Sequence, residues 1–358
     1  MKLPVLGVTM GDAAGVGPEI IARAAGEPSV RSSCRPVVIG AAGPMREALG
    51  LIGSPLGLHP VSRVADCRWA DGTLEVLDLA NVDMATLPRR EVSAAAGRAA
   101  YEYIERAVRL AQAGEIDAIV TAPVNKEALA AAGVRHSGHT EILAELSGTR
   151  DFAMLLMGKE LKVIHVTTHV ALRRVPDLVT RERVLKTLRL AHKTLVDLGQ
   201  PHGRIAVAGL NPHAGEDGLF GDEEKLAIVP AIEAGRAEGM NITGPLPADT
   251  LFSRARGGEF DIVVAMYHDQ GHIPVKTLGF EYDEATKKWT GLSGVNVTVG
   301  LPFLRVSVDH GTAFDRAWKG VANHESMVEA LDVATRMVAS TVRSARSAGG
   351  PAGAGVAP

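Results

Sequence analysis

Short apolar runs alternate with amphipathic stretches along most of this 358-residue chain, and that alternation restricts the fold more than any other feature. Runs such as residues 3–10, 36–40 and 117–121 have the length and composition of buried strands. Between them, residues 94–113 carry apolar side chains at helical spacing. Alternating strands and helices are typical of a mostly parallel sheet. Because one domain holds roughly 100–200 residues, we predict a two-domain α/β fold.

The composition argues against several classes of function. A net charge of −3 and an aromatic content of 4% give no basis for binding nucleic acid or an anionic membrane. The two cysteines, Cys34 and Cys67, form no metal-type pair and indicate a reducing compartment. Neither a signal-peptide cleavage pattern nor an apolar run of about 20 residues is present in the sequence. We therefore expect a soluble cytoplasmic protein that binds neither membranes nor nucleic acid.

Further helices and loops follow from local patterns. Residues 281–294 are predicted to form a charged surface loop. Residues 348–358 contain only Gly, Ala, Val and Pro, which predicts a disordered tail beginning at about residue 346. Helices are predicted at residues 140–147, 181–198, 223–238 and 326–344.

Three of the apolar runs lead directly into a histidine: His169, His213 and His268. In an open α/β sheet the ligand crevice forms at the carboxyl ends of the strands. Three imidazoles delivered there can hold one divalent cation and leave coordination positions for a substrate. The pattern therefore predicts a three-histidine metal site, although each histidine alone is equally compatible with a surface or core position.

Two further polar residues accompany this site. Asp269 directly follows His268 and is predicted to orient its imidazole. His165 lies four residues before His169, on the same face of a strand, and has two interpretations. It either supports the metal ligands or is a buried core histidine with a hydrogen-bond partner.

Several residues are suited to binding an anion. His139 and Thr140 stand where a helix is predicted to begin, with Thr140 as its N-cap, and a helix N-terminus attracts phosphate or carboxylate. Lys126 follows another strand, Lys276 lies eight residues after His268, and Arg305 follows a glycine-proline turn. Cations beside a metal site indicate a doubly anionic substrate, whereas each cation alone could be a surface charge.

Two glycine-bearing loops are candidates for cofactor binding. Residues 11–17 follow the first strand but lack the Gly-x-Gly opening and the later acidic residue of a dinucleotide fingerprint. Residues 309–315 form a second polar loop after a strand, which could hold an adenosine ribose.

Longer motifs resemble a known family. Residues 209–216, 244–250, 266–271 and 307–313 (GLNPHAGE, GPLPADT, MYHDQG and SVDHGTA) resemble those of 4-hydroxythreonine-4-phosphate dehydrogenases of pyridoxal phosphate biosynthesis. The resemblance extends from residue 7 to about residue 338. It implies a fold like that of isopropylmalate and isocitrate dehydrogenases, with the active site in an interdomain cleft. The expected units are a cofactor-side domain (1–125 and 265–345) and a substrate, metal and dimerisation domain (126–264).

The resemblance also implies the roles of individual residues. It implies NAD or NADP and one divalent metal ion (zinc, magnesium or cobalt) as cofactors. It further implies a homodimer with shared active sites, in which one metal ligand comes from the partner subunit. The implied metal ligands are His169, His213 and His268; the substrate-binding residues are His139, Thr140, Lys276, Asn296 and Arg305; and the cofactor-binding residues are Gly11, Asp12, Gly15, His310, Gly311, Asp315 and Asn323.

The implied reaction is the oxidation of 4-phosphooxy-L-threonine to 2-amino-3-oxo-4-phosphooxybutanoate, which then loses carbon dioxide to give 3-amino-2-oxopropyl phosphate. Lys276 and Asp249 are the candidates for the catalytic base. Residues 281–293 look like an insertion typical of a paralogous branch that oxidises D-threonate or D-erythronate 4-phosphate, which is the alternative substrate class. Two other functions remain open at this stage: a non-redox metal hydrolase, since such a metal can also activate water, and a non-catalytic phosphate-binding protein.

Overall fold

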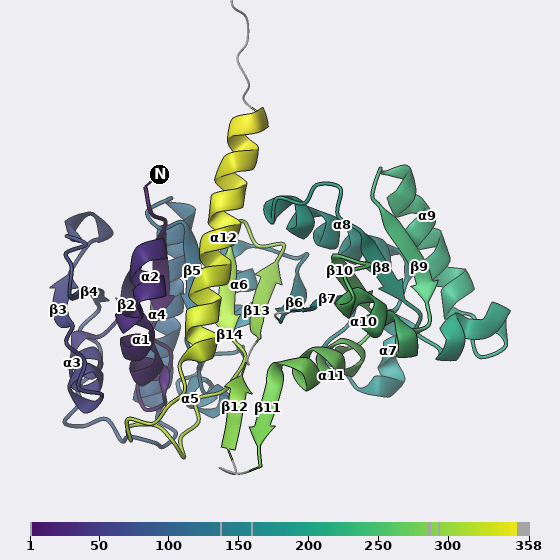
Figure 1. Ribbon diagram of the computed structural model, residues 1–358. Helices are drawn as coiled ribbons and strands as arrows, with labels where there is room; N and C mark the ends of the chain where they lie inside the picture. Colours follow the sequence, from purple (N-terminus) through teal and green to yellow (C-terminus); the bar gives the residue numbers. More distant parts are fainter. Residues whose placement is uncertain (1, 137, 159, 285–287, 293, 349–358) are drawn as a thin grey trace, which may run out of the picture.

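The computed structural model describes residues 2–136, 138–158, 160–284, 288–292 and 294–348. Twelve strands of this part of the chain form one sheet (Figure 1). In spatial order they are β3 (Gly57–Val61), β4 (Thr73–Asp78), β2 (Arg35–Gly40), β1 (Val5–Thr9), β5 (Ala118–Thr121), β14 (Arg305–Val308), β13 (Val295–Val299), β6 (Ala153–Met157), β7 (Lys162–His165), β10 (Ile262–Ala265), β8 (Ile205–Ala208) and β9 (Ile242–Leu246).

Most neighbouring strands are parallel. The six strands from β3 to β14 run in one direction, and the four strands from β7 to β9 are also mutually parallel. The pairs β14–β13, β13–β6 and β6–β7 are antiparallel and join the two parallel groups. The predicted α/β class with mostly parallel strands is therefore confirmed. The sheet is continuous through both groups, and the predicted domain boundaries stay a prediction.

Helices cover both faces of the sheet (Figure 1). The long helix α12 packs with α1 and α2 on one face, and α4 packs with α5 and α6 on the other. The helices are α1 (Gly17–Gly26), α2 (Pro28–Ser33), α3 (Ala42–Leu51), α4 (Ala94–Gln112), α5 (Lys126–Ala131), α6 (His139–Ser147), α7 (Val175–Leu178), α8 (Arg181–Asp197), α9 (Val229–Ala237), α10 (Ala248–Arg256), α11 (His268–Gly279) and α12 (Glu325–Ala348), with short turns of helix at Val64–Asp66, Leu172–Arg174, Pro212–Gly218 and Glu224–Ile228.

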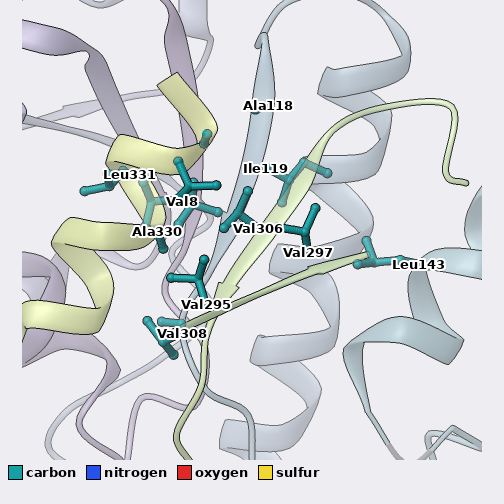
Figure 2. Packing of buried hydrophobic residues seen from close by; sticks show 14 of the residues in the cluster. Val8, Ala118, Ile119, Leu143, Val295, Val297, Val306, Val308, Ala330 and Leu331 are labelled. Carbon is teal, nitrogen blue, oxygen red and sulfur yellow. The ribbon is translucent and has the colours of Figure 1, made fainter. Parts of the chain in front are cut away.

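Side-chain alternation on β13 and β14 separates the core from the candidate site. Val295 and Val297 of β13 and Val306 of β14 are buried, and Val295 and Val306 lie near Ala330 of α12 (Figure 2). Because successive side chains on a strand point to opposite faces, the polar residues between these valines point away from α12. This alternation places the polar residues on the side of the sheet where a cleft forms.

Three local predictions were wrong. Residues 281–293 were expected to form a loop, but β11 (Phe280–Asp283) and β12 (Lys288–Leu292) pair as an antiparallel hairpin. Their alternation of polar with aromatic or β-branched residues, which favours strands, was obscured by the charges. Thr140 is not an N-cap, since α6 begins one residue earlier, at His139. The apolar run 262–267 was expected to lead into a loop at His268, but His268 is the first residue of α11.

The structure also differs from the predicted helix at residues 223–238 and from the predicted start of the C-terminal tail. The stretch 223–238 is divided into a π-type turn, Glu224–Ile228, and α9, which has Pro230 near its start. Proline lacks the N–H that a continuous α-helix would use there, which accounts for the division. Helix α12 continues to Ala348, and the remainder of the predicted tail lies outside the described residues.

Candidate active site

The three strands that precede the predicted metal ligands are adjacent and parallel. Because β7, β10 and β8 are neighbours in this order, their carboxyl ends meet at one edge of the sheet. The ring centroids of His169 and His268 lie 5.7 Å apart there. The ring of His213 instead lies 6.3 Å from that of Phe220, and its backbone is left-handed with a φ of 52°. Among the described residues of one chain, no three His, Cys, Asp or Glu side chains form a group that could hold a metal ion.

Other polar side chains surround His268. Its Nδ1 lies 2.6 Å from Oδ1 of Asp269, as predicted, which leaves Nε2 available to a ligand. The ring of His272 stacks on that of His268, with centroids 3.7 Å apart. His272 Nδ1 in turn lies 3.2 Å from Nε2 of His165, whose Nδ1 is 3.1 Å from the Met154 carbonyl oxygen. His165 is therefore a buried, hydrogen-bonded histidine that also reaches His268 through His272.

The protonation of these imidazoles suits a metal ion. Burial lowers the pKa of His165 to about 3 and that of His272 to about 4. Burial also lowers the pKa of His169, with the neighbouring His268 adding to the effect. Neutral imidazole is the form that binds a divalent cation, so the lowered pKa of His169 suits this role.

A cleft of about 440 Å³ opens beside His169. Its lining comes from the ends of β5 and β14, the starts of α5 and α6, and the first residues of β6. Lys276, Asp249, His213 and His268 are not part of this lining. The predicted site residues that do line it are Lys126, His139, Thr140, His169, Asn296, Arg305, His310 and Gly311.

Arg305 is the buried cation of the cleft. Its side chain donates hydrogen bonds to Oγ1 of Thr298 at 2.9 Å and to Oγ1 of Thr121 at 2.7 Å. Its Nε is buried and has no hydrogen-bond partner among the described residues. Burial lowers the pKa of Arg305 to about 9, and the carboxylate of Glu141 partly opposes this shift. An anion bound beside Arg305 would offset the loss of hydration.

Two other lining residues carry unpaired polar atoms. Nε2 of His139 and Oδ1 of Asn296 are buried without a hydrogen-bond partner among the described residues. Burial and the charge of Arg305 hold the pKa of His139 well below its usual range, so its imidazole is neutral. Buried polar groups are nearly always hydrogen-bonded in folded proteins. Nε2 of His139, when it carries the ring proton, and the N-terminus of α6 therefore fit an anionic ligand, whereas Oδ1 of Asn296, which can only accept, fits a hydroxyl group of that ligand.

Lys276 is linked to the lining through an acid. Its Nζ lies 3.0 Å from Oδ2 of Asp309, whose Oδ1 accepts a hydrogen bond of 2.7 Å from Nδ2 of Asn296. Asp249, the other candidate base, is exposed in the first turn of α10. Of the two candidates, Lys276 is the one connected to residues that line the cleft.

The two candidate cofactor loops are in contact. The backbone N–H of Val16 donates to the Thr312 carbonyl at 3.0 Å, and indole Nε1 of Trp318 donates to the Ala13 carbonyl at 3.1 Å. Gly15 lies so close to Thr312 that a Cβ there would be 2.9 Å from the Cβ of Thr312. Two loops distant in sequence thus form one surface next to the cleft.

Buried polar atoms also occur in this loop pair. Asp12 is fully buried, and its Oδ2, like Nε2 of His310, has no hydrogen-bond partner among the described residues. Burial raises the pKa of Asp12 to about 6, although a hydrogen bond from the Ala14 N–H opposes the shift. Asp315 is exposed, and Asn323 uses Oδ1 to accept from the N–H of Glu325. Asp12 and His310 are the residues here whose free atoms fit a polar cofactor.

Comparison with known proteins identifies the family. The model of the family described as pyridoxal phosphate biosynthetic protein PdxA matches residues 32–334. A D-threonate 4-phosphate dehydrogenase of Cupriavidus necator is 51% identical over 339 residues, which span 93% of this chain and 98% of that protein. The chain belongs to the PdxA family.

Solved structures agree with this assignment. A 4-hydroxythreonine-4-phosphate dehydrogenase from Burkholderia phymatum is 48% identical, with a TM-score of 0.82 over 94% of this chain and 99% of that one. One from Klebsiella pneumoniae is 45% identical, with a TM-score of 0.84 over 94% of this chain and 98% of that one. The predicted family is thus confirmed, and the PdxA relatives support a dehydrogenase over a metal hydrolase or a phosphate-binding protein.

One cleft residue of this PdxA chain was missed in the sequence. Arg183 lines the cleft from the start of α8, where its helical position suggested only one more cation of a charged helix. No sequence pattern links Arg183 to the backbone carbonyls of Phe152 and Val166, with which its side chain forms hydrogen bonds.

The described residues include no helix with the length and apolar character that crossing a membrane requires.

Proposed function

We propose that this protein oxidises the 3-hydroxyl group of a four-carbon acid with a 4-phosphate, using NAD or NADP and a divalent cation (zinc, magnesium or cobalt), with loss of carbon dioxide. The supporting observation is the juxtaposition of His169, close to His268, with a cleft built around buried Arg305. A phosphorylated acid carries the two anionic groups that such a cleft accommodates.

Different residues of the chain would bind the substrate, the metal ion and the cofactor. Arg305, His139 and the start of α6 bind the anionic ends and hold the substrate in register. His169 and His268 would hold the cation, and Asp12 and His310 would bind the nicotinamide cofactor. When bound, these groups supply Lewis-acid stabilisation of the forming oxyanion and a hydride acceptor.

Lys276 and Asp309 take part in proton transfer. The Asp309 carboxylate, which Nζ of Lys276 holds at 3.0 Å, would accept the proton that the substrate hydroxyl loses, giving the protonated acid. Oxidation at C3 places a carbonyl β to the C1 carboxylate, and this 3-oxo acid then releases carbon dioxide. The proton needed at C2 after that release can return from the same pair.

We further propose that the site is completed in a homodimer, with His213 donated by the partner subunit, and that the enzyme works in the cytoplasm. The resemblance to a family with shared sites supports the dimer. The separate position of His213, beside Phe220, is compatible with it.

Two substrate classes fit this proposal. The curated relatives are named for D-threonate 4-phosphate, and the solved structures for 4-hydroxythreonine 4-phosphate. The test is turnover of these two acids and of D-erythronate 4-phosphate with each cofactor, followed by the near-ultraviolet absorbance of reduced nicotinamide. We expect turnover of at least one acid, its loss after treatment with a chelator, and its return when a divalent metal is added. A lack of turnover with every combination would overturn the proposal.

A further inference from the structure

Arg183 is a cationic side chain of the cleft to which the mechanism above gives no role. It lies in the first turn of α8, whose N-cap Thr180 accepts a hydrogen bond from the Arg183 N–H. It lines the cleft together with Lys126 and Arg305. Because α8 packs against the second parallel group of strands, Arg183 approaches the cleft from a different element than the other two cations.

Two backbone carbonyls hold this guanidinium in place. Nε donates to the Val166 carbonyl at 2.8 Å, and an NH2 group donates to the Phe152 carbonyl at 3.4 Å. A guanidinium has five N–H donors, so these contacts fix its plane and still leave donors for a ligand. Burial lowers the pKa of Arg183, although the carboxylate of Asp151 opposes the shift, so the charge lacks part of its hydration and gains from an anionic partner.

The charge balance of the cleft shows what Arg183 adds. The lining contains the cations Lys126, Arg183 and Arg305 and the carboxylates Glu141 and Asp309. Asp309 is already neutralised by an ion pair with a lysine outside the lining. Without Arg183 the described lining would therefore hold two cations, Lys126 and Arg305, against the one remaining carboxylate, Glu141, and Arg183 increases this excess of positive charge.

The two candidate substrate classes differ in charge at C2. Near neutral pH, a 2-hydroxy acid with a 4-phosphate carries about three negative charges, whereas the 2-amino acid carries an ammonium group and a net charge of about −2. The C2 hydroxyl can also accept a hydrogen bond from a guanidinium, while an ammonium group has only donors. An additional fixed cation near C2 therefore attracts the hydroxy acid more strongly than the amino acid, whose ammonium group it repels.

We propose that Arg183 determines substrate specificity by binding the carboxylate and 2-hydroxyl end of the substrate, which selects a phosphorylated 2-hydroxy acid over the corresponding 2-amino acid. This inference rests on the proposed function, because it assigns the substrate class of the same site. It predicts that the wild-type enzyme prefers D-threonate 4-phosphate to 4-hydroxy-L-threonine 4-phosphate.

The test measures kcat/KM for both acids in Arg183→Met and Arg183→Lys. We expect Arg183→Met to lower kcat/KM for D-threonate 4-phosphate on the order of 10- to 100-fold, the range for one lost charge-assisted hydrogen bond. The value for the amino acid should change less than about threefold, since for that acid the attraction between the guanidinium and the carboxylate is opposed by the repulsion of the C2 ammonium group. Arg183→Lys keeps the charge and should retain part of the preference.

Lys186→Met is the matched control. Lys186 is one turn further along α8, pairs with Asp151 at 2.5 Å, and does not line the cleft. Its replacement removes the same charge from the same helix and should leave the preference unchanged. Equal losses for both acids in Arg183→Met, or a preference lost completely in Arg183→Lys, would overturn the proposal.

A second variant and a binding measurement keep the test of Arg183 independent of protein folding and of the proposed function. If Arg183→Met does not fold, Arg183→Gln replaces it as the neutral variant. If the wild type oxidises neither acid, the proposed function fails. Calorimetric binding of the two acids still tests Arg183 in that case, and equal affinity of the wild type for both would overturn its role.

Discussion

The ammonium group of Lys276 lies 3.0 Å from Oδ2 of Asp309, and this ion pair joins helix α11 to the end of strand β14. The other carboxylate oxygen of Asp309 holds the side chain of Asn296 on β13. Two predicted substrate residues, Lys276 and Asn296, are thus positioned by an acid to which the sequence assigned no role. One carboxylate at the end of β14 thus connects Asn296 of the cleft lining with Lys276, which lies outside that lining.

Replacing Asp309 by Asn should lower kcat more than it raises KM. The amide oxygen can still accept from Asn296, but the variant loses the charge that pairs with Lys276 and the oxygen that can carry a proton. We expect kcat to fall on the order of 100-fold or more, as for other losses of a proton-transfer group. Steady-state kinetics measures this effect, and thermal unfolding should show little change in Tm. An unchanged kcat would exclude the pair from proton transfer.

Mixing two inactive variants tests whether the metal site is shared. With His169 and His268 in one subunit and His213 from the partner, a heterodimer of His169→Ala and His213→Ala contains one intact site. Random reassortment should therefore restore about a quarter of the wild-type activity and metal content, since half the dimers are mixed and half their sites are intact. If all three ligands come from one chain, every site in the mixture lacks a ligand and no activity returns.

Replacing Asp12 by Asn should stabilise the fold at neutral pH. Burial raises the pKa of Asp12 from 3.8 to about 6, so the folded state holds the proton more tightly than the unfolded state. For an acid with a raised pKa, the destabilisation is absent below the unfolded pKa, grows as the pH rises from the unfolded to the folded pKa, and is fully present above the folded pKa. The variant should gain up to about 3 kcal/mol in unfolding free energy at about pH 7 relative to wild type, and little at about pH 4.

Denaturant unfolding at the two pH values measures this gain. The amide can keep the contact with the Ala14 N–H, so the loop should be preserved. If Asp12 binds the cofactor, the KM for NAD or NADP should rise in the same variant. A gain in stability that is the same at both pH values would show that the carboxylate is not the cause.

Much of the fold could be predicted because its signals are local. A short apolar run before each of His169 and His268 suffices to place both at the carboxyl ends of strands, which the sheet order then brings together. The role of Arg183 depends on carbonyls of Phe152 and Val166, which are far away in the sequence. The pattern of residues along α8 does not indicate which distant carbonyls the Arg183 side chain contacts. The hairpin of β11 and β12 was missed for a different reason, since its charged residues resemble those of a loop.

The packing of Gly15 against Thr312 offers a last prediction. A Cβ at position 15 would lie 2.9 Å from the Cβ and 3.0 Å from the carbonyl oxygen of Thr312, and the backbone oxygen cannot move away as a flexible side chain would. Gly15→Ala should therefore separate the two cofactor loops, destabilise the fold by about 1–3 kcal/mol and raise the KM for the cofactor more than that for the acid. Gly26→Ala is the control, because nothing lies within 4 Å of a Cβ there, at the exposed end of α1. Equal effects on both KM values would mean that the loop pair does not bind the cofactor.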